Sequence, residues 1–377
     1  MKQFILLIVF SCCCSFLFAQ YSVRLIVTDA ATQKGADIYL AGDFNNWNPG
    51  DYNFKMKIFG ATRKVYVFKD VAAGKFAFKF TRGSWEKVES TAKGEDLENH
   101  EVEVSSDTSL SFSIAGWKDD FPDKPKPNTA SKQVQVLDTA FFMPQLNRYR
   151  KIWVYLPVNY NLLKSKSFPV IYMHDGQNLF NEQTAFAGEW GVDECLDTLQ
   201  RLLNKDCIVV GIDNGGEHRM QEYNPYDDAK FGKGEGSQYV DFLVQTLKPF
   251  IDKHYRTQKD PAHTVTAGSS MGGLISLYAV IKYPDVFGAA GVFSPAFQVA
   301  PRLYLDAQQM KWKTIHRIFF YAGAKESETM VANMKQMEDA LYNSKMIEEQ
   351  EIIFPLGQHN ETYWRQVFDD FYKWLNF

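Results

Sequence analysis

Apolar residues follow two different periods along the chain, and the change of period divides the sequence into two parts. In the first part, residues 20–116, short segments alternate apolar and polar positions, and turns containing Gly or Asn separate them. This alternation is typical of strands that are buried on one face only. Because no segment here has a convincing helical pattern, we predict a small all-β sandwich. The expected strands cover residues 21–27, 38–40, 65–68, 76–80, 102–104 and 110–114.

In the second part, residues 133–377, continuous apolar runs alternate with segments whose apolar residues recur at helical spacing. Two leading antiparallel strands are expected at residues 134–142 and 152–156. The strand–helix alternation after them predicts a mainly parallel, doubly wound α/β sheet that binds ligands at the carboxyl ends of its strands. The expected later strands cover residues 168–173, 207–212, 263–266, 288–293, 318–321 and 351–354, and the expected helices cover residues 191–203, 239–255, 274–281, 329–341 and 362–375.

Two further segments belong to neither domain. Residues 117–132 are charged and proline-rich, so we expect an extended linker. In residues 1–19, Lys2 precedes a long apolar stretch that ends at Ala19, which predicts a secretory signal and no membrane span. A lipoprotein signal with a lipid anchor at Cys12 is the alternative. We therefore expect a secreted or periplasmic protein, or alternatively an outer-membrane or cell-surface lipoprotein.

Composition narrows the range of partners. The 377 residues are 45% hydrophobic and 23% charged, which is ordinary for a globular protein. The net charge of -4, without a block of Lys or Arg, gives no reason to expect nucleic-acid binding. Beyond the signal segment the cysteines are Cys195 and Cys207, which we expect to be buried and unpaired, although a disulfide between them stays open.

The sequence Gly268-Ser269-Ser270-Met271-Gly272 lies between a β-branched run and a pattern at helical spacing. Strand, tight G-x-S-x-G turn and helix are the context of a nucleophile elbow, which holds its serine in a strained conformation above the sheet. We therefore predict that Ser270 is a nucleophile. The backbone N–H of Met271, in the first turn of the helix, then faces the position of an oxyanion. A loop without chemical consequence is the alternative.

Two later strand ends supply partners for Ser270. Glu326 and His359 each follow an apolar run that is predicted to be a strand. The chain order serine, acid, histidine is the order of α/β-hydrolases, in which the imidazole acts as the base and the carboxylate fixes its tautomer. Glu328 is the alternative to Glu326 as the acid. His174 precedes the serine, so we expect it to form hydrogen bonds beside the site.

Two stretches make this prediction more specific. YMHDGQNLF at residues 172–180 and TAGSSMGGLISLYAVIKYPDVFGAAGVFSPAF at residues 266–297 resemble the putative esterase family, and the likeness covers residues 135–377. That family includes feruloyl and acetylxylan esterases, enterochelin esterases, S-formylglutathione hydrolase and mycolyltransferases. The resemblance implies that Gln177 donates a second backbone N–H to the oxyanion, together with Met271.

Two other side chains are candidates for substrate contact. Trp190 is predicted to line the pocket or to cap the helix that follows it. Arg219 lies within residues 211–225, which resemble a loop near the acyl or sugar pocket of relatives. A loop that is held by pairs between Arg219 and carboxylates is the alternative.

The first domain carries a resemblance of its own. AGDFNNWNP at residues 41–49 and FKFTRGSWEKVE at residues 78–89 resemble a carbohydrate-binding module of the glycogen-binding, isoamylase N-terminal type. The resemblance implies that Trp47 and Trp85 stack on sugar rings, since an indole face suits the apolar face of a pyranose. A purely structural role for both tryptophans is the alternative.

These features predict an exported serine esterase that hydrolyses feruloyl or acetyl decorations on a polysaccharide or oligosaccharide through an acyl-enzyme. We expect no metal and no organic cofactor, since spacings such as H-E-x-x-H and C-x-x-C are missing from the sequence. Hydrolysis of a siderophore trilactone and acyl transfer are alternatives that keep the same nucleophile, and a serine peptidase fits the elbow alone. A non-catalytic glycan-binding protein with a vestigial hydrolase fold is an alternative of a different class.

Overall fold

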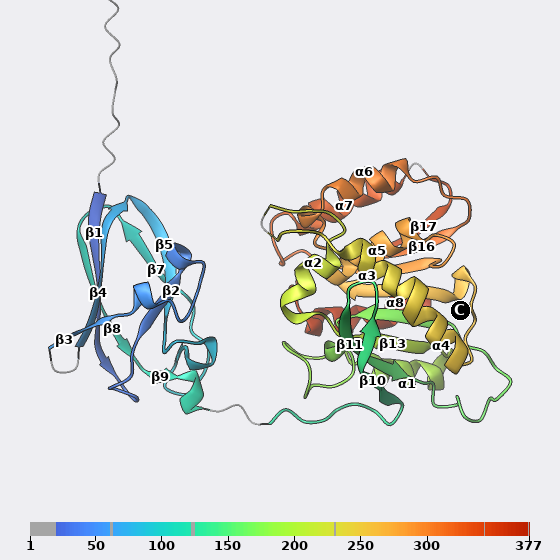
Figure 1. Ribbon diagram of the computed structural model, residues 1–377, viewed down its shortest axis with the longest axis horizontal. Coiled ribbons are helices and arrows are strands. Elements are labelled where there is room, and N and C mark those ends of the chain that lie inside the picture. The colour runs from blue at the N-terminus through green and yellow to red at the C-terminus, as the bar shows by residue number, and fades with distance from the viewer. Residues whose placement is uncertain (1–19, 61–62, 122–124, 230, 343, 376) are drawn as a thin grey trace, which may run out of the picture. The chain divides into compact units, whose positions relative to one another are not determined.

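A computed structural model describes residues 20–60, 63–121, 125–229, 231–342, 344–375 and 377. The chain divides into two compact units, with the boundary between residues 124 and 125 (Figure 1). The predicted signal segment and Cys12 lie outside the described residues. No helix in the described ranges is both long enough and apolar enough to cross a bilayer.

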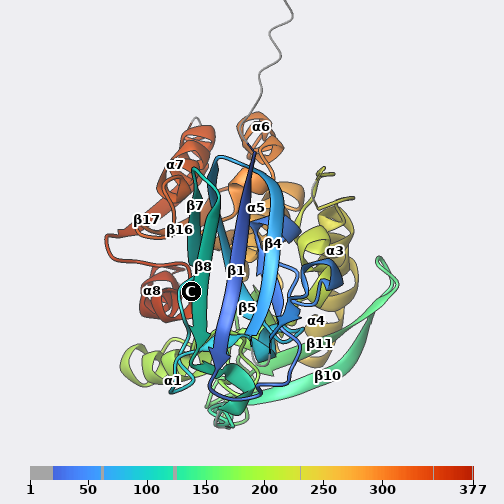
Figure 2. The same ribbon diagram turned by 90° about the vertical axis from the view of Figure 1, so that its left-hand side faces the viewer.

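The first unit is built from strands and short 3₁₀ turns. Its sheets have the orders β3-β4-β1-β8, β2-β5-β7 and β6-β9, and Figure 2 shows β8, β1 and β4 side by side. Alternate residues of β1 and β5, such as Val23, Leu25 and Phe78, are fully buried in one shared core, so the predicted all-β domain is confirmed. The strands are β1 (Gln20–Ala30), β2 (Tyr39–Gly42), β3 (Lys57–Phe59), β4 (Arg63–Ala72), β5 (Gly74–Thr81), β6 (Glu89–Ser90), β7 (His100–Val104), β8 (Thr108–Ile114) and β9 (Gly116–Trp117).

Both ends of the expected linker take part in folded structure. Trp117 lies in β9 and is fully buried in the core of the first unit. In the second unit, the hydroxyl of Thr129 donates to Glu189 at 2.7 Å, and the N–H of Ser131 donates to Asp193 at 2.6 Å. The charge and proline content of the segment did not indicate these contacts, because each depends on a partner that is distant in sequence.

The second unit contains an eight-stranded sheet with the order β10-β11-β13-β12-β14-β15-β16-β17. Strand β11 is antiparallel to both of its neighbours, and the strands from β13 to β17 pair in parallel, which confirms the predicted doubly wound α/β fold. The strands are β10 (Val134–Met143), β11 (Arg148–Tyr155), β12 (Val170–His174), β13 (Ile208–Ile212), β14 (Thr264–Ser269), β15 (Ala289–Phe293), β16 (His316–Gly323) and β17 (Ile347–Phe354). The helices are α1 (Val192–Leu203), α2 (Arg219–Tyr223), α3 (Gly236–Phe242), α4 (Lys248–His254), α5 (Met271–Lys282), α6 (Arg302–Gln309), α7 (Met330–Leu341) and α8 (Glu361–Leu375).

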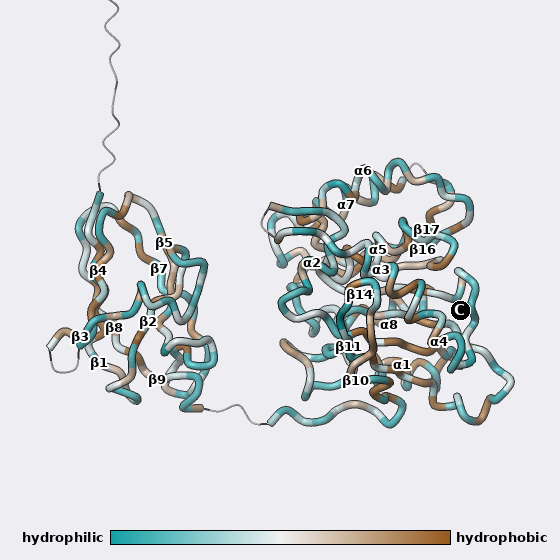
Figure 3. The backbone as a smooth tube through the Cα atoms, viewed as in Figure 1, coloured by the Kyte–Doolittle hydropathy of each residue, from teal (hydrophilic) through white to brown (hydrophobic). Residues whose placement is uncertain are grey.

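Helices cover both faces of this sheet. Side chains of α1 and α8 pack with one set of strand residues, which includes Trp153 and Ile171. Side chains of α3 to α7 pack with the alternate set, which includes Val154 and Val170. Figure 3 shows the hydrophobic stretches that supply these two cores along the strands and helices. The continuous apolar runs seen in the sequence follow from burial of the strands on both faces.

Residues 239–255, predicted as one helix, contain a change of helical type. Helix α3 is followed by a π-helix at Leu243–Leu247, and α4 begins directly after it. Pro249 has no N–H to donate to the carbonyl group four residues earlier, and a wider turn before it accommodates this loss. The apolar spacing continues through both helical types, so the sequence pattern alone does not reveal the change.

Candidate active site

Ser270 occupies the sharp turn between β14 and α5. Its backbone angles, φ 58° and ψ -120°, are rare for a residue other than glycine. The N–H of Ser270 donates to the carbonyl of Phe293 at 2.9 Å, and its carbonyl accepts from the N–H of Ala296 at 3.1 Å. The end of the neighbouring strand thus holds the turn in its strained conformation, as a nucleophile elbow requires.

Close backbone contacts explain two glycines of the elbow. A Cβ atom on Gly273 would lie 2.9 Å from the carbonyl oxygen of Phe293. A Cβ atom on Gly268 would lie 3.0 Å from the carbonyl carbon of Gly272. Side chains at these positions would push α5 away from β14 and β15, so both glycines preserve the geometry of the turn.

His359 and Glu326 form a hydrogen bond at the edge of the sheet where the parallel strands end. His359 Nδ1 lies 2.7 Å from Glu326 Oε2, and the Glu326 side chain is 1% exposed whereas that of His359 is 38% exposed. Glu326 follows β16 and His359 follows β17, which pair directly in the sheet. A buried carboxylate on Nδ1 fixes the tautomer that leaves Nε2 free to accept a proton.

The second oxygen of Glu326 is also occupied. Oε1 accepts hydrogen bonds from the N–H of Gly323 and from the hydroxyl of Ser294, both at 2.6 Å. Ser294 follows β15, the strand between those that carry Ser270 and Glu326. Sequence reasoning did not identify Ser294, although its place at the end of a strand was a signal that could have found it.

The alternative acid, Glu328, is in a different environment. Glu328 is exposed and makes no hydrogen bond with another described residue. His174 is 1% exposed and contacts the hydroxyls of Tyr239 and Thr266 at 2.9 and 3.2 Å. The geometry therefore favours Glu326 as the partner of His359 and shows His174 buried in the interior of the second unit.

The predicted oxyanion donors lie on two separate elements. Met271 is the first residue of α5, and Gln177 lies in a 3₁₀ turn that follows β12. Neither N–H donates to another group in the part of the chain that the structure describes. The carbonyl of Gln177 accepts from Thr184 at 2.8 Å, and its side-chain oxygen accepts from the N–H of Asn214 at 3.1 Å. The turn is therefore fixed while its N–H stays available to a ligand.

Arg219 supports this turn. Its Nε and a terminal nitrogen donate to the two oxygens of Asp175 at 2.7 and 2.9 Å. Asp175 is buried and has a left-handed φ of 57°, directly before the turn of Gln177. Of the two interpretations of Arg219, the structure shows the loop held by a carboxylate pair.

Trp190 lies in the interior of the second unit, which corrects the prediction for this residue. We predicted that it lines the substrate pocket or caps α1, but its side chain is 2% exposed. Its ring stacks on Trp364 at a centroid distance of 5.7 Å and meets Phe293 edge-on at 4.9 Å. Trp190 is a core residue because these aromatic contacts remove it from solvent.

The hydroxyl of Ser270 makes no hydrogen bond to His359 or to any other residue in the described ranges. Ser270 is partly exposed, and the sheet order β14-β15-β16-β17 brings its strand end and those of Glu326 and His359 to one edge. In free enzymes the contact between nucleophile and base often tightens only when substrate binds. The catalytic roles of these residues stay predictions.

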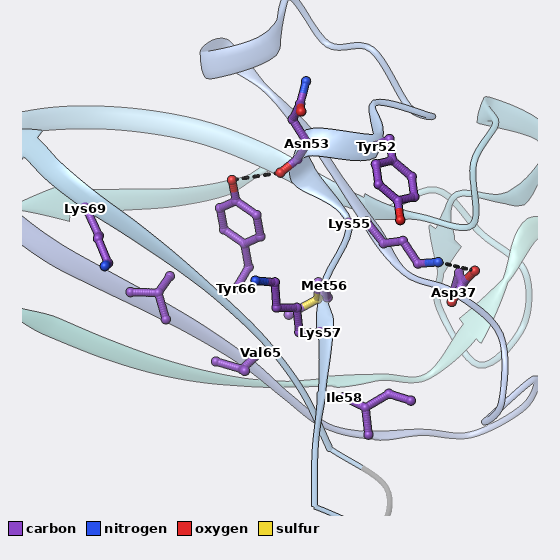
Figure 4. A pocket seen from close by; sticks show the side chains of 11 residues that line it. Asp37, Tyr52, Asn53, Lys55, Met56, Lys57, Ile58, Val65, Tyr66 and Lys69 are labelled. Carbon is purple, nitrogen blue, oxygen red and sulfur yellow. Dashed lines mark hydrogen bonds and ion pairs between the residues drawn. The ribbon is translucent and has the colours of Figure 1, made fainter.

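The first unit offers two separate surfaces. The rings of Trp47 and Trp85 lie 6.4 Å apart with an interplanar angle of 28°, and Trp85 is 42% exposed. A cavity of about 630 Å³ lies elsewhere on the unit, where Tyr52 and Tyr66 are set among lysine side chains such as Lys57 (Figure 4). Because neither tryptophan lines this cavity, sugar binding at the tryptophans and binding in the cavity are separable.

The two remaining cysteines are free thiols. Cys207 is buried, and Cys195 is partly buried. No disulfide joins them in the structure, as the simpler interpretation of the sequence predicted. Burial raises the pKa of the Cys195 thiol to about 12, which makes it a poor nucleophile at neutral pH.

Comparison with known proteins shows which family the second unit matches. Residues 144–375 match a family model described as "Putative esterase". The uncharacterized protein YbbA of Bacillus subtilis is 28% identical over 245 residues, which cover 60% of this chain and 92% of YbbA. An endo-1,4-beta-xylanase/feruloyl esterase of Xylanibacter ruminicola is 24% identical over 202 residues, which cover 51% of this chain and 25% of that protein.

A solved structure supports the fold. The enterobactin esterase FES from Shigella flexneri superimposes with a TM-score of 0.52 at 16% identity, over 90% of this chain and 89% of that chain. The family model spans nearly all of the second unit and includes the elbow serine and the paired acid and histidine. The chain therefore belongs to the putative esterase family.

Proposed function

We propose that this protein is a serine esterase that removes acyl groups from hydroxyls of a carbohydrate through an acyl-enzyme. The observation that carries the proposal is the hydrogen bond between buried Glu326 and His359, at the sheet edge where the strained Ser270 stands. Membership of an esterase family supports ester hydrolysis as the reaction class.

The proposed reaction has two stages. Ser270 Oγ attacks the ester carbonyl carbon while His359 Nε2 accepts the hydroxyl proton, and the N–H groups of Met271 and Gln177 stabilise the oxyanion. The bond to the alcohol breaks, and the alcohol leaves with the proton from His359. Water then attacks the acyl-enzyme with His359 as the base, and the carboxylic acid leaves as Ser270 regains its proton. Glu326 stabilises the imidazolium in both stages.

Feruloyl or acetyl esters of a polysaccharide or oligosaccharide are the substrates that we propose. One relative is named as a xylanase joined to a feruloyl esterase, which supports a plant-type polysaccharide. The exposed ring of Trp85 in the first unit supports a carbohydrate ligand as well. Export through residues 1–19 is part of the same proposal.

The test compares Ser270→Ala with Ser165→Ala, an exposed serine in the loop before β12, at the opposite edge of the sheet. Turnover of p-nitrophenyl acetate and methyl ferulate should be abolished in the first variant and unchanged in the second. A fluorophosphonate probe should label Ser270 in the wild type. Full activity of Ser270→Ala would refute the assignment of the nucleophile. Turnover of a siderophore trilactone in preference to feruloylated and acetylated oligosaccharides would instead make the siderophore ester the substrate.

A further inference from the structure

A cavity of about 560 Å³ opens beside the turn that carries Gln177. Its lining comes from the loop after β12, with Thr184 and Phe186, and from the loop after β13, with Asp213 and Asn214. Both loops follow neighbouring parallel strands at the edge where Ser270 lies. The volume is in the range of small-molecule sites, and the position is next to a predicted oxyanion donor.

Phe186 presents its ring to this cavity from a fixed backbone. Its side chain is 90% exposed. The N–H of Phe186 donates to the side-chain oxygen of Asn178 at 3.1 Å, and its carbonyl accepts from Lys126 at 3.3 Å. Asn178 is buried and donates in turn to buried Glu361 at 3.0 Å. The backbone that carries this large, exposed apolar ring is therefore anchored to the interior of the second unit.

The part of the lining that comes from the loop after β13 is polar. Asp213 accepts from the indole N–H of Trp153 at 2.6 Å through Oδ1, while Oδ2 makes no hydrogen bond with the described residues. Asn214 donates to Asp175 at 2.7 Å and accepts from the N–H of Gly216 at 2.9 Å, which fixes its side chain. The lining of the cavity thus combines an aromatic side chain with a carboxylate that has a free acceptor oxygen.

We propose that this cavity binds a sugar ring of the alcohol part of the ester, with Phe186 as the stacking platform and Asp213 as an acceptor for a sugar hydroxyl. A pyranose or furanose ring has an apolar C–H face for the phenyl ring and hydroxyls at its edge for the carboxylate. An aromatic acyl group would suit a second apolar wall instead of the polar one found here. This inference rests on the proposed esterase function and names the part of the substrate that the site selects.

Four esters distinguish a contact with the sugar from a contact with the acyl group. Feruloylated and acetylated xylo-oligosaccharides carry the sugar, whereas methyl ferulate and p-nitrophenyl acetate lack it. We expect Phe186→Ala to lower kcat/KM for both sugar esters by roughly threefold to tenfold, through KM, as expected from the loss of one aromatic stacking contact. Turnover of methyl ferulate and p-nitrophenyl acetate should change by less than about twofold. Tyr342→Ala is the matched control, because Tyr342 is 83% exposed and lies between α7 and β17, at the opposite edge of the sheet.

A binding measurement keeps the inference testable if no ester is turned over. Titration calorimetry with xylotetraose, on a Trp47→Ala/Trp85→Ala background that removes the predicted sugar contacts of the first unit, should show a weaker affinity after Phe186→Ala by the same factor. Weaker binding without hydrolysis would refute the esterase function and keep the sugar site. Equal losses for methyl ferulate and the sugar esters would assign the cavity to the acyl group, and unchanged kinetics and binding would also overturn the inference.

Discussion

The indole N–H of Trp364 donates to the hydroxyl of Ser294 at 2.8 Å, and that hydroxyl donates onward to Glu326. Ser294 has a left-handed φ of 44° and is fully buried. Because the indole occupies the acceptor side of the hydroxyl, the serine proton points to the carboxylate. The interior of the second unit thus orients Glu326, and through it the imidazole of His359.

Weakening the series of hydrogen bonds from Trp364 through Ser294 to Glu326 should lower kcat without affecting substrate binding. We expect Trp364→Phe, which keeps an aromatic ring, to reduce kcat by about 3- to 10-fold, and Ser294→Ala, which removes a bond to a charged group, to reduce it by about 10- to 100-fold. KM for p-nitrophenyl acetate should stay within about twofold for both. Steady-state kinetics and a thermal melt check this, and a fall in activity explained wholly by unfolding would contradict a positioning role.

The two acidic residues after β16 provide a matched comparison. Glu326→Gln removes the charge beside His359 and presents an amide that can hold the wrong tautomer, so kcat should fall by about 10² to 10⁴-fold. Glu328→Gln changes an exposed side chain without a partner among the described residues and should stay within about twofold of the wild type. The measurement is kcat/KM for p-nitrophenyl acetate at pH 7.5. A larger loss in the Glu328 variant would reverse the assignment of the acid.

The sequence allowed prediction of the features that depend on local pattern. The alternation of continuous apolar runs with helical spacing predicted the doubly wound sheet, and the G-x-S-x-G turn led to Ser270. The rule that ligands bind at strand ends led to Glu326 and His359. Contacts between distant segments were not accessible in this way. The pairing of Trp364 with Ser294, and the place of Trp190 in the core, depend on how α8 packs on the sheet, which no local period encodes.

The buried His174 should make stability depend on pH. Burial lowers its pKa from 6.5 to about 4, so the folded protein keeps the ring neutral where the unfolded chain already binds a proton. Between these pH values the unfolded state binds more protons than the folded state. The contribution of His174 to the free energy of unfolding is therefore fully present above pH 6.5 and is lost as the pH falls toward 4. The free energy of unfolding should decrease by on the order of 2 kcal/mol from pH 7 to pH 5 through this group alone.

Urea denaturation of His174→Gln at the two pH values checks this expectation. The variant is expected to be less stable at pH 7 because buried hydrogen bonds change, but its stability should depend less on pH. His254→Gln, at an exposed histidine, should retain the slope of the wild type. An unchanged slope in His174→Gln would show that other groups cause the pH dependence.

Residues 126–131 should matter to the second unit although they lie in the segment expected to be a linker. Lys126 donates to the carbonyl of Ala185 at 2.7 Å, and Thr129 and Ser131 contact Glu189 and Asp193. A chain that begins at residue 133 loses these contacts, whereas one that begins at residue 125 keeps them. We expect the shorter chain to melt roughly 5–10 °C lower, since several hydrogen bonds to charged or buried groups are lost. Equal melting temperatures would mean that the contacts contribute nothing to stability.

A sugar-binding measurement can show which of the two surfaces of the first unit binds a glycan. Trp85→Ala should abolish the retardation of the protein in affinity electrophoresis through xylan or starch, because stacking on the exposed indole is the main contact that we predict there. Tyr52→Ala removes a ring that is 76% exposed in the separate cavity and should leave the retardation unchanged. Hydrolysis of p-nitrophenyl acetate should be the same in both variants, since the substrate has no sugar. Retardation lost only in Tyr52→Ala would move the glycan site to the cavity, and retardation unchanged in both would leave the tryptophans with a structural role.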